Sequence, residues 1–335
     1  MQRALFPGRW TATVLGFLIL AGIGASRLYG YLFFHSLAEL FGISISIGIF
    51  IIAWHSREIA DIPFFLFLGI WGICVSGIDL LHTLAFAGMG VFKGATSNLP
   101  TQLWIAARAV ESIVFLVAPL SIGRKPKPQL LLLGAIAVFV CLVFVIFLTD
   151  LFPACYVEGS GLTPFKKISE YVISAVFGAA IVLLVARRKT FDADLMRLVV
   201  AALALKLLSE LAFTLYAGVY DVFNLSGHLL RIVAAALIYL GIIRTGFEKP
   251  YRLLFRDLKK RESELMEALE QVKTLRGFLP ICSSCKKVRT DSGYWQQIEA
   301  YVTAHSEAEF THSLCPDCVG KLYPGYVDDE GKEPD

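Results

Sequence analysis

The sequence predicts an all-α membrane protein, with an eight-helix transmembrane bundle, an amphipathic linker helix and a small C-terminal module. Composition gives the first reason. The chain is 56% hydrophobic and 18% charged, with a mean hydropathy of +0.64, whereas soluble domains are about 45–50% apolar and about 25% charged. Charge is also uneven, because residues 1–250 hold 32 of the 59 charged side chains and residues 251–335 hold the other 27. Finally, apolar runs of about 18 residues or more, long enough to cross a bilayer, recur through the first part.

The expected spans divide the chain into four parts. Eight apolar runs qualify, at residues 11–33, 35–54, 63–86, 101–122, 129–149, 168–187, 195–217 and 226–245. Only His35 and its neighbours separate the first two runs. The first run is too long for a cleaved signal peptide, carries Arg27 and lacks a clear cleavage site, so we expect it to span. The parts are a membrane domain (1–248), a linker helix (249–277), a cysteine module (278–324) and a disordered acidic tail (325–335).

Basic residues in the short loops predict the orientation of the bundle in the lipid. With the N-terminus in the cytoplasm, the inner loops hold nine Lys and Arg residues. The outer loops then hold three, which are Lys93, Lys166 and Lys167. Eight spans would place both termini in the cytoplasm.

Ionisable side chains inside the spans form the candidate site. They are costly in hydrocarbon, so they usually face a cavity or each other. Several pairs, such as Arg108 and Glu111, are three or four residues apart and therefore share a helix face. Most fall in the outer half of their span. The candidate ligand-binding residues are Arg27, Glu39, Asp79, His82, Arg108, Glu111, Lys206, Glu210, His228 and Arg231.

These residues support a polar cavity that opens to the extracytoplasmic side and holds a small polar or charged ligand. The alternative is that the pairs only hold helices together, since buried polar contacts in membranes average below about 1 kcal/mol. Haem is a further alternative, because two imidazoles on facing helices can ligate iron. His82 and His228 are the best-matched pair in depth, although a membrane histidine often serves only as a hydrogen-bond partner.

Two stretches around these residues carry a family resemblance. "GIDLLHTLAFAGMGVF" (77–92) and "NLPTQLWIAARAVESIVFLVAP" (98–119) resemble the bacterial membrane-associated sensor domain of the MASE family, third type. The resemblance covers about residues 10–247. It implies a sensory input module in the bacterial cytoplasmic (inner) membrane, commonly joined to a cytoplasmic signalling output. It also marks Asp79, His82, Arg108 and Glu111 as characteristic polar positions.

Residues 250–279 predict a linker helix with coiled-coil character. Leu258, Leu265 and Val272 repeat every seven residues, and charged side chains fill most other positions. Gly277 and Pro280 end the pattern. We expect a parallel homodimer along this stripe. Arg261 and Glu262 interrupt the stripe, which leaves a solvated spacer or a helix packed on its own domain as the alternatives.

Four of the seven cysteines form the pattern of a zinc site. Cys282 and Cys285, then Cys315 and Cys318, make two CxxC pairs that suit one tetrahedral zinc ion. The 29 residues between the pairs contain Trp295, which we expect on a helix that covers the site. A redox or zinc-release sensor, an iron–sulfur cluster and a metal-free fold are the alternatives. The segment 279–324 resembles a short tail at the C-terminal end of bacterial sensor and response-regulator-type proteins.

These features predict a membrane signal-transduction sensor that acts through a cytoplasmic signalling protein. No P-loop, GxSxG, HExxH, GGDEF-type run or ATP-binding glycine box occurs, so we expect no enzyme activity in this chain. The net charge of +3 gives no sign of nucleic-acid binding. The alternatives are a haem-binding electron-transfer protein and a transporter, which is expected to have broken helices or inverted repeats.

Overall fold

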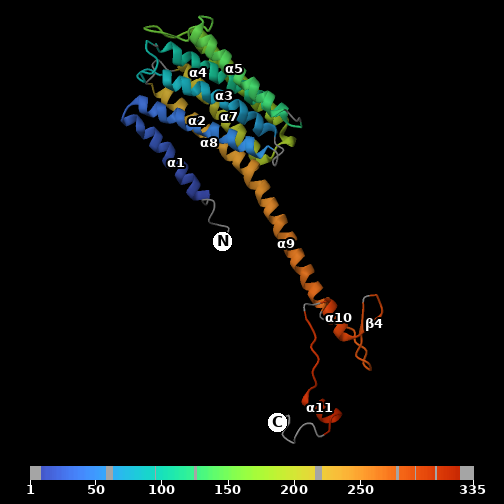
Figure 1. The fold of residues 1–335 in the computed structure, drawn as a ribbon. Helices are drawn as coiled ribbons and strands as arrows, with labels where there is room; N and C mark the ends of the chain where they lie inside the picture. The colour runs from blue at the N-terminus through green and yellow to red at the C-terminus, as the bar shows by residue number, and fades with distance from the viewer. Residues whose placement is uncertain are drawn as a thin grey trace. The chain divides into compact units, whose positions relative to one another are not determined.

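The computed structural model describes residues 9–57, 63–94, 96–123, 127–215, 221–276, 279–290, 292–305 and 308–324. The chain divides into two compact units, Met1–Phe255 and Arg256–Asp335. The expected tail (325–335) lies outside the described residues. In the first unit the described long helices are α1 (Arg9–Ala25), α2 (Tyr31–Ser56), α3 (Pro63–Ala85), α4 (Asn98–Val117), α5 (Pro128–Leu148), α6 (Pro164–Ala186), α7 (Ala193–Leu215) and α8 (Val222–Ile242). Helices α2–α8 lie side by side in Figure 1.

Local sequence explains several helix starts. Pro128 and Pro164 stand at the first position of α5 and α6, where the missing N–H is not needed. Thr163 caps α6 by accepting a hydrogen bond from the Lys166 backbone N–H at 3.2 Å. Asp221 caps α8 in the same way through the Phe223 N–H, at 3.1 Å. Helices α6 and α8 therefore begin where the chain supplies a side-chain partner for an open N–H group.

Seven of the eight expected spans are present in the described part of the chain. The first expected span is shorter than predicted. Helices α2 to α8 are long and apolar enough to cross a membrane, whereas Val14–Leu28 forms only a shorter apolar helix. The break falls at Gly30 and not at His35, which lies inside α2. Gly30 has a φ of 155°, which side chains rarely allow. A short 3₁₀ helix, η1 (Ser26–Leu28), precedes this break.

Helices α3 and α4 are the most buried of the long apolar helices described, and α5 is the least buried. Twelve residues of α4 are buried, whereas α5 buries only Ala135 and Ile146. The exposed face of α5 consists of Leu130, Leu133, Ile136, Val140, Phe144 and Leu148. An apolar face of this kind suits contact with lipid.

The loop between α5 and α6 folds back onto the start of α4. Its two short strands, β1 (Tyr156–Val157) and β2 (Gly161–Leu162), pair antiparallel. The Asn98 Oδ1 atom accepts hydrogen bonds from the Cys155 and Tyr156 backbone N–H groups, at 2.7 and 3.0 Å. Cys155 is fully buried, and this burial raises the pKa of its thiol to about 12. The loop is therefore anchored to the bundle.

The second unit contains most of helix α9 (Lys249–Arg276), which matches the expected linker helix. The other elements are strands β3 (Val288–Arg289) and β4 (Trp295–Gln296), which pair antiparallel, and helices α10 (Ile298–His305) and α11 (Pro316–Leu322). We predicted Trp295 on a helix, but it lies in β4, which pairs antiparallel with β3. Leu254, Leu258, Leu265 and Leu269 on α9 are each more than half exposed.

Substitution of Gly69 is predicted to destabilise the bundle, because a Cβ there would lie 3.1 Å from both Phe50 Cα and Ala53 Cβ on α2. Overpacking of this kind typically costs about 1–3 kcal/mol. We expect Gly69→Val to lower the melting temperature in detergent. Gly48→Val is the matched control, since a Cβ at Gly48 meets nothing within 4 Å. Equal shifts for the two variants would contradict the predicted close approach of α2 and α3.

The exposed stripe on α9 generates a second prediction. If two copies of α9 pair in parallel, single cysteines placed from 254 to 275 will form disulfide cross-links with a seven-residue period. The measurement is the cross-linked fraction in native membranes after mild oxidation. A flat profile along the helix would count against the homodimer.

Candidate functional site

Arg108 on α4 is the most deeply buried basic side chain among the predicted site residues, with 0% exposure. Its Nη2 atom donates a hydrogen bond to Asp79 Oδ2 on α3 at 2.6 Å, and its Nη1 atom pairs with Glu111 one turn further along α4. Lys206 on α7 then donates to the other Glu111 oxygen at 2.5 Å. These ion pairs connect α3, α4 and α7 through the inside of the bundle.

Glu39 on α2 is the centre of a second group of ion pairs. Its Oε1 atom lies 3.0 Å from His228 Nδ1 and 3.3 Å from Arg231 Nη1, both on α8. Arg231 also lies 3.5 Å from Asp79 Oδ2 through its other terminal nitrogen. Arg231 therefore links Glu39 to the Arg108 group.

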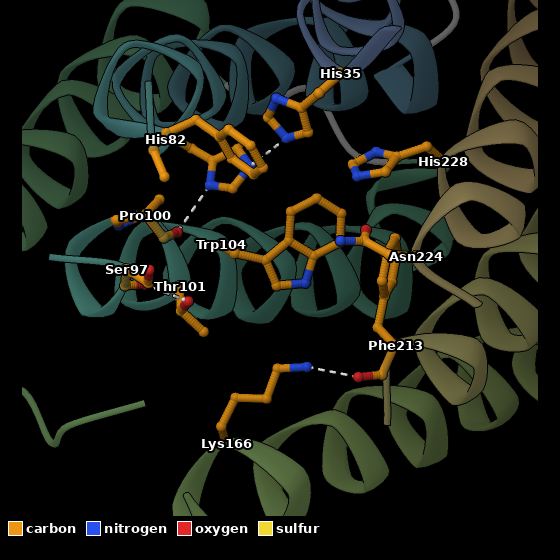
Figure 2. A pocket seen from close by; sticks show the side chains of 12 residues that line it. His35, His82, Ser97, Pro100, Thr101, Trp104, Lys166, Phe213, Asn224 and His228 are labelled. Carbon is orange, nitrogen blue, oxygen red and sulfur yellow. Dashed lines mark hydrogen bonds between the residues drawn. The ribbon is translucent and has the colours of Figure 1, made fainter. Parts of the chain in front are cut away.

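Histidine and tryptophan side chains pack together beside these pairs (Figure 2). The His35 and His82 Nε2 atoms are 3.2 Å apart, and His82 Nδ1 lies 2.7 Å from the Pro100 carbonyl oxygen. Trp104 lies against His82 and His228, with ring centroids 5.3 and 5.6 Å apart. The Arg231 guanidinium lies 4.4 Å from the centre of the Trp104 ring, a cation–π contact.

The position of Lys166 corrects the sequence interpretation, which placed it in an outer loop. Lys166 lies in the first turn of α6 and is only 1% exposed. It pairs with Glu170 at 2.7 Å and donates to the Phe213 carbonyl oxygen at 2.6 Å. The sequence did contain a sign of this ion pair, because the four-residue spacing from Lys166 to Glu170 places both side chains on one helix face.

Three small cavities border these groups. The first, of about 40 Å³, is lined by residues from the start of α2, the end of α3 and the start of α4, among them His35, His82 and Trp104. The second, also of about 40 Å³, is lined by Glu39, Asp79, Glu111, Lys206 and Arg231. The third, of about 60 Å³, shares Glu111 and Lys206 with the second and is otherwise mostly apolar. The polar groups therefore face internal space rather than the outer surface.

We call the connected ion pairs around Arg108 and Glu39, together with the side chains that pack against them, the polar cluster. Nine of the ten predicted ligand-binding residues lie in it. Glu210 is 1% exposed and interacts electrostatically with Arg108 and Arg231. Arg27 is the exception, because it lies in η1 at the edge of the bundle and lines none of the three cavities. Lys166 was not in the predicted set. Trp104 and His35 also line the first cavity without having been predicted as ligand-binding residues.

The packing gives no support to haem. The His35 and His82 rings contact each other directly, and Trp104 packs against both His82 and His228. A porphyrin plane does not fit between rings that touch. The described cavities have room for a few small molecules of the size of water.

Each CxxC pair in the second unit forms a compact turn. Around the first pair, the Cys282 N–H donates to the Lys287 carbonyl at 2.8 Å and the Lys286 N–H to the Cys282 carbonyl at 3.0 Å. In the second, Cys315 caps α11 and the Cys318 N–H donates to its carbonyl at 2.9 Å. Hydrogen bonds from backbone N–H groups within each pair lower the pKa of Cys282 and Cys315. Among the described residues, no three of these cysteines lie close enough together to hold one metal ion.

The seven long apolar helices define a multi-pass membrane protein. The family model for the membrane-associated sensor domain MASE3 matches residues 26–250, and the chain belongs to this family. The match confirms the family that the two motifs indicated. No curated protein and no solved structure matches the chain.

The Lys166–Glu170 pair yields a stability prediction. Lys166→Met leaves a buried carboxylate without its cation, and breaking a buried pair costs about 3–5 kcal/mol. We expect a clear fall in melting temperature in detergent, and partial recovery in Lys166→Met/Glu170→Gln. Lys167→Met is the control, because Lys167 is exposed on the same helix. A Lys166→Met variant as stable as the control would contradict the buried ion pair.

Proposed function

We propose that this membrane sensor binds a small polar or charged ligand in its polar cluster and signals through α9 to a zinc-binding module that recruits a cytoplasmic partner. The proposal includes an extracytoplasmic position for the cluster, cytoplasmic termini, residence in the bacterial inner membrane and a homodimer. It also takes the chain to have no enzymatic output of its own. One observation carries it, namely the set of buried ion pairs around Arg108 and Glu39, which border internal cavities.

The composition of the cluster favours a ligand over a purely structural role. Structural polar contacts between membrane helices usually involve small uncharged groups such as Ser and Thr. Here five carboxylates and four Lys or Arg side chains converge, and intramembrane charges by default mark functional sites. Glu210 Oε2 is buried and has no hydrogen-bond partner among the described groups. The residues concerned are Glu39, Asp79, Glu111, Glu170 and Glu210, with Arg108, Lys166, Lys206 and Arg231.

The position of the cluster argues against a transporter. The first cavity lies near the ends of α3 and α7 and the starts of α4 and α8. The second continues to Glu111 and Lys206, and the third reaches Ile49 and Leu68. Towards the other end, apolar side chains such as Phe64, Leu184 and Val199 are almost fully buried. A path through the bundle would have to cross this apolar packing.

The signal has a continuous helical route. Helix α8 carries His228 and Arg231, and its last turn leads into η4 (Ile243–Glu248), a π-helical turn, and then into α9. A ligand that binds one packing of α2 and α8 more tightly than another would shift the equilibrium between them. The exposed leucines of α9 provide the surface through which two copies respond together.

The C-terminal module fits a zinc ion in its donor set. Four thiols in two compact turns match the Cys₄ pattern of structural zinc sites, and the lowered pKa values of Cys282 and Cys315 favour the thiolate form that binds metal. Zinc would draw the two pairs together and order a module with few buried side chains. Exposed Tyr294, Phe310, Leu314 and Tyr323 then offer an apolar surface for a partner.

Arg108→Ala is the direct test of the ligand interpretation. We expect the variant to accumulate in membranes and to change the cross-linking of a cysteine at position 265 on α9, because the network that positions α3, α4 and α7 is broken. Arg197→Ala is the matched control, since Arg197 is 74% exposed in its pair with Asp194. If Arg108→Ala fails to accumulate while Arg197→Ala does, the pairs serve only to hold the helices together.

Metal analysis tests the module. The full chain is expected to contain about one more zinc ion than a chain in which Cys282, Cys285, Cys315 and Cys318 are all replaced by serine. Inductively coupled plasma mass spectrometry on both proteins gives the difference. A difference below about half an ion would contradict the zinc assignment.

A further inference from the structure

Three potential metal ligands lie close together inside the bundle, where His35 and His82 line the first cavity and Glu39 lines the second. His35 and Glu39 lie one turn apart on α2, and His82 faces them from α3. One ligand atom from each lies within 4.8 Å of the other two, and all three residues are buried. No other group of three such ligands occurs among the described residues.

We propose that His35, Glu39 and His82 form a binding site for one divalent transition-metal ion of the zinc type. The proposal rests on the proposed function, because it names the class of ligand that the cavity receives. It differs from the haem hypothesis, since the ion is held by the protein alone. It is also separate from the cysteine module.

The spacing of the two imidazoles suits a shared ion. Zinc–nitrogen bonds are about 2.0–2.1 Å long, so two nitrogens on one tetrahedral ion lie about 3.3 Å apart. The His35 and His82 Nε2 atoms are 3.2 Å apart. A direct N–H···N hydrogen bond between them would have a similar length, and the experiment below separates the two.

The surroundings of His82 are those of a metal ligand. Its Nδ1 atom lies 2.7 Å from the Pro100 carbonyl oxygen, which can only accept a hydrogen bond, so Nδ1 carries the proton. The Nε2 atom then carries a lone pair directed at His35 Nε2, which can accept the His35 N–H or, in its place, bind a cation. Histidine ligands of metals commonly donate their second N–H to a carbonyl in this way.

The donor set and the cavity define what the site holds. Two imidazoles and one carboxylate occur in catalytic zinc sites and in non-haem iron sites, both of which keep open coordination positions. The cavity of about 40 Å³ beside the histidines has room for about three waters. An ion here would keep one or more exchangeable water ligands.

Arg231 competes with a cation for Glu39. Its Nη1 atom lies 3.3 Å from Glu39 Oε1, while Nη2 lies 3.5 Å from Asp79 Oδ2. His228 contacts the same Glu39 oxygen at 3.0 Å. When an ion takes Glu39, Arg231 still has Asp79 as its partner. Metal binding would thereby move a side chain of α8, the helix that leads to α9.

The test measures Zn²⁺ and Co²⁺ binding to the full-length chain in detergent, with Cys282, Cys285, Cys315 and Cys318 replaced by serine to remove the other site. We expect one ion per chain and a Co²⁺ spectrum without thiolate ligation. His35→Ala, Glu39→Gln and His82→Ala should each weaken binding at least ~100-fold, because loss of groups that only support a ligand already costs about 10–100-fold. His55→Ala is the matched control, since His55 is exposed near the end of the same helix.

Arg231→Gln gives a result that a structural role does not predict. Removing a positive charge next to Glu39 should strengthen Zn²⁺ binding, whereas loss of a structural contact would weaken it. All measurements use protein that remains monodisperse and helical by circular dichroism. The proposal is supported if one ion binds per chain, if the three ligand variants lose this binding, and if Arg231→Gln binds Zn²⁺ more tightly. Absence of binding in the folded serine chain, or equal binding by all variants, overturns it.

Two further outcomes separate this proposal from the proposed function. If no ion binds but Arg108→Ala still alters cross-linking on α9, the metal site is wrong and the sensor proposal stands with another ligand. If the ion binds as expected but cross-linking on α9 does not respond to Zn²⁺, the metal site stands and the sensor proposal loses its ligand.

Discussion

A guanidinium buried inside a membrane bundle is stable only when carboxylates surround it. The packing of the whole membrane domain depends on meeting this requirement at Arg108. Its 0% exposure requires Asp79 from α3 and Glu111 from α4 at fixed positions. Glu111 then needs Lys206, and Asp79 shares Arg231 with Glu39. Five helices are therefore held in register by charge compensation, since apolar side chains alone have little preference between lipid and a neighbouring helix. The arrangement is specific because removing any member leaves another charge unpaired.

Much of this arrangement was predictable from the sequence because lipid imposes strong rules. Apolar length located seven spans, and the cost of a charge in hydrocarbon singled out nine residues that do converge. The partners were not predictable, because helical spacing defines a shared face but not which helix lies opposite. Lys206 thus reaches Glu111 on α4 rather than a residue of its own helix. Lys166 was missed because its position beside Pro164 resembled a loop. The first span was predicted to run on to residue 33 because Gly30, where the helix breaks, lies within an apolar run.

The two parts of the chain differ in how they reach a defined structure. The membrane unit buries most of its charged groups against one another, although a few buried polar atoms, such as Glu210 Oε2, have no hydrogen-bond partner among the described residues. The C-terminal unit leaves apolar side chains such as Trp295 and Leu314 about half exposed, because a segment of this size has little core of its own. The proposed zinc ion and partner would cover part of this exposed apolar surface. The two units therefore differ in how much of their apolar and polar surface is buried within the chain itself.

The π-helical turn η4 sets the angular phase between helices α8 and α9. A π turn adds one residue to the usual bonding pattern, and each residue of an α-helix corresponds to a rotation of about 100°. Conversion of η4 (Ile243–Glu248) to a regular α-helical turn would rotate the leucine stripe of α9 by roughly that angle about its own axis. If two copies of α9 pair as proposed, such a step would bring charged positions to their interface in place of the leucines. In the homodimer proposed above, the hydrogen bonding of η4 would thus decide which face of α9 meets its partner.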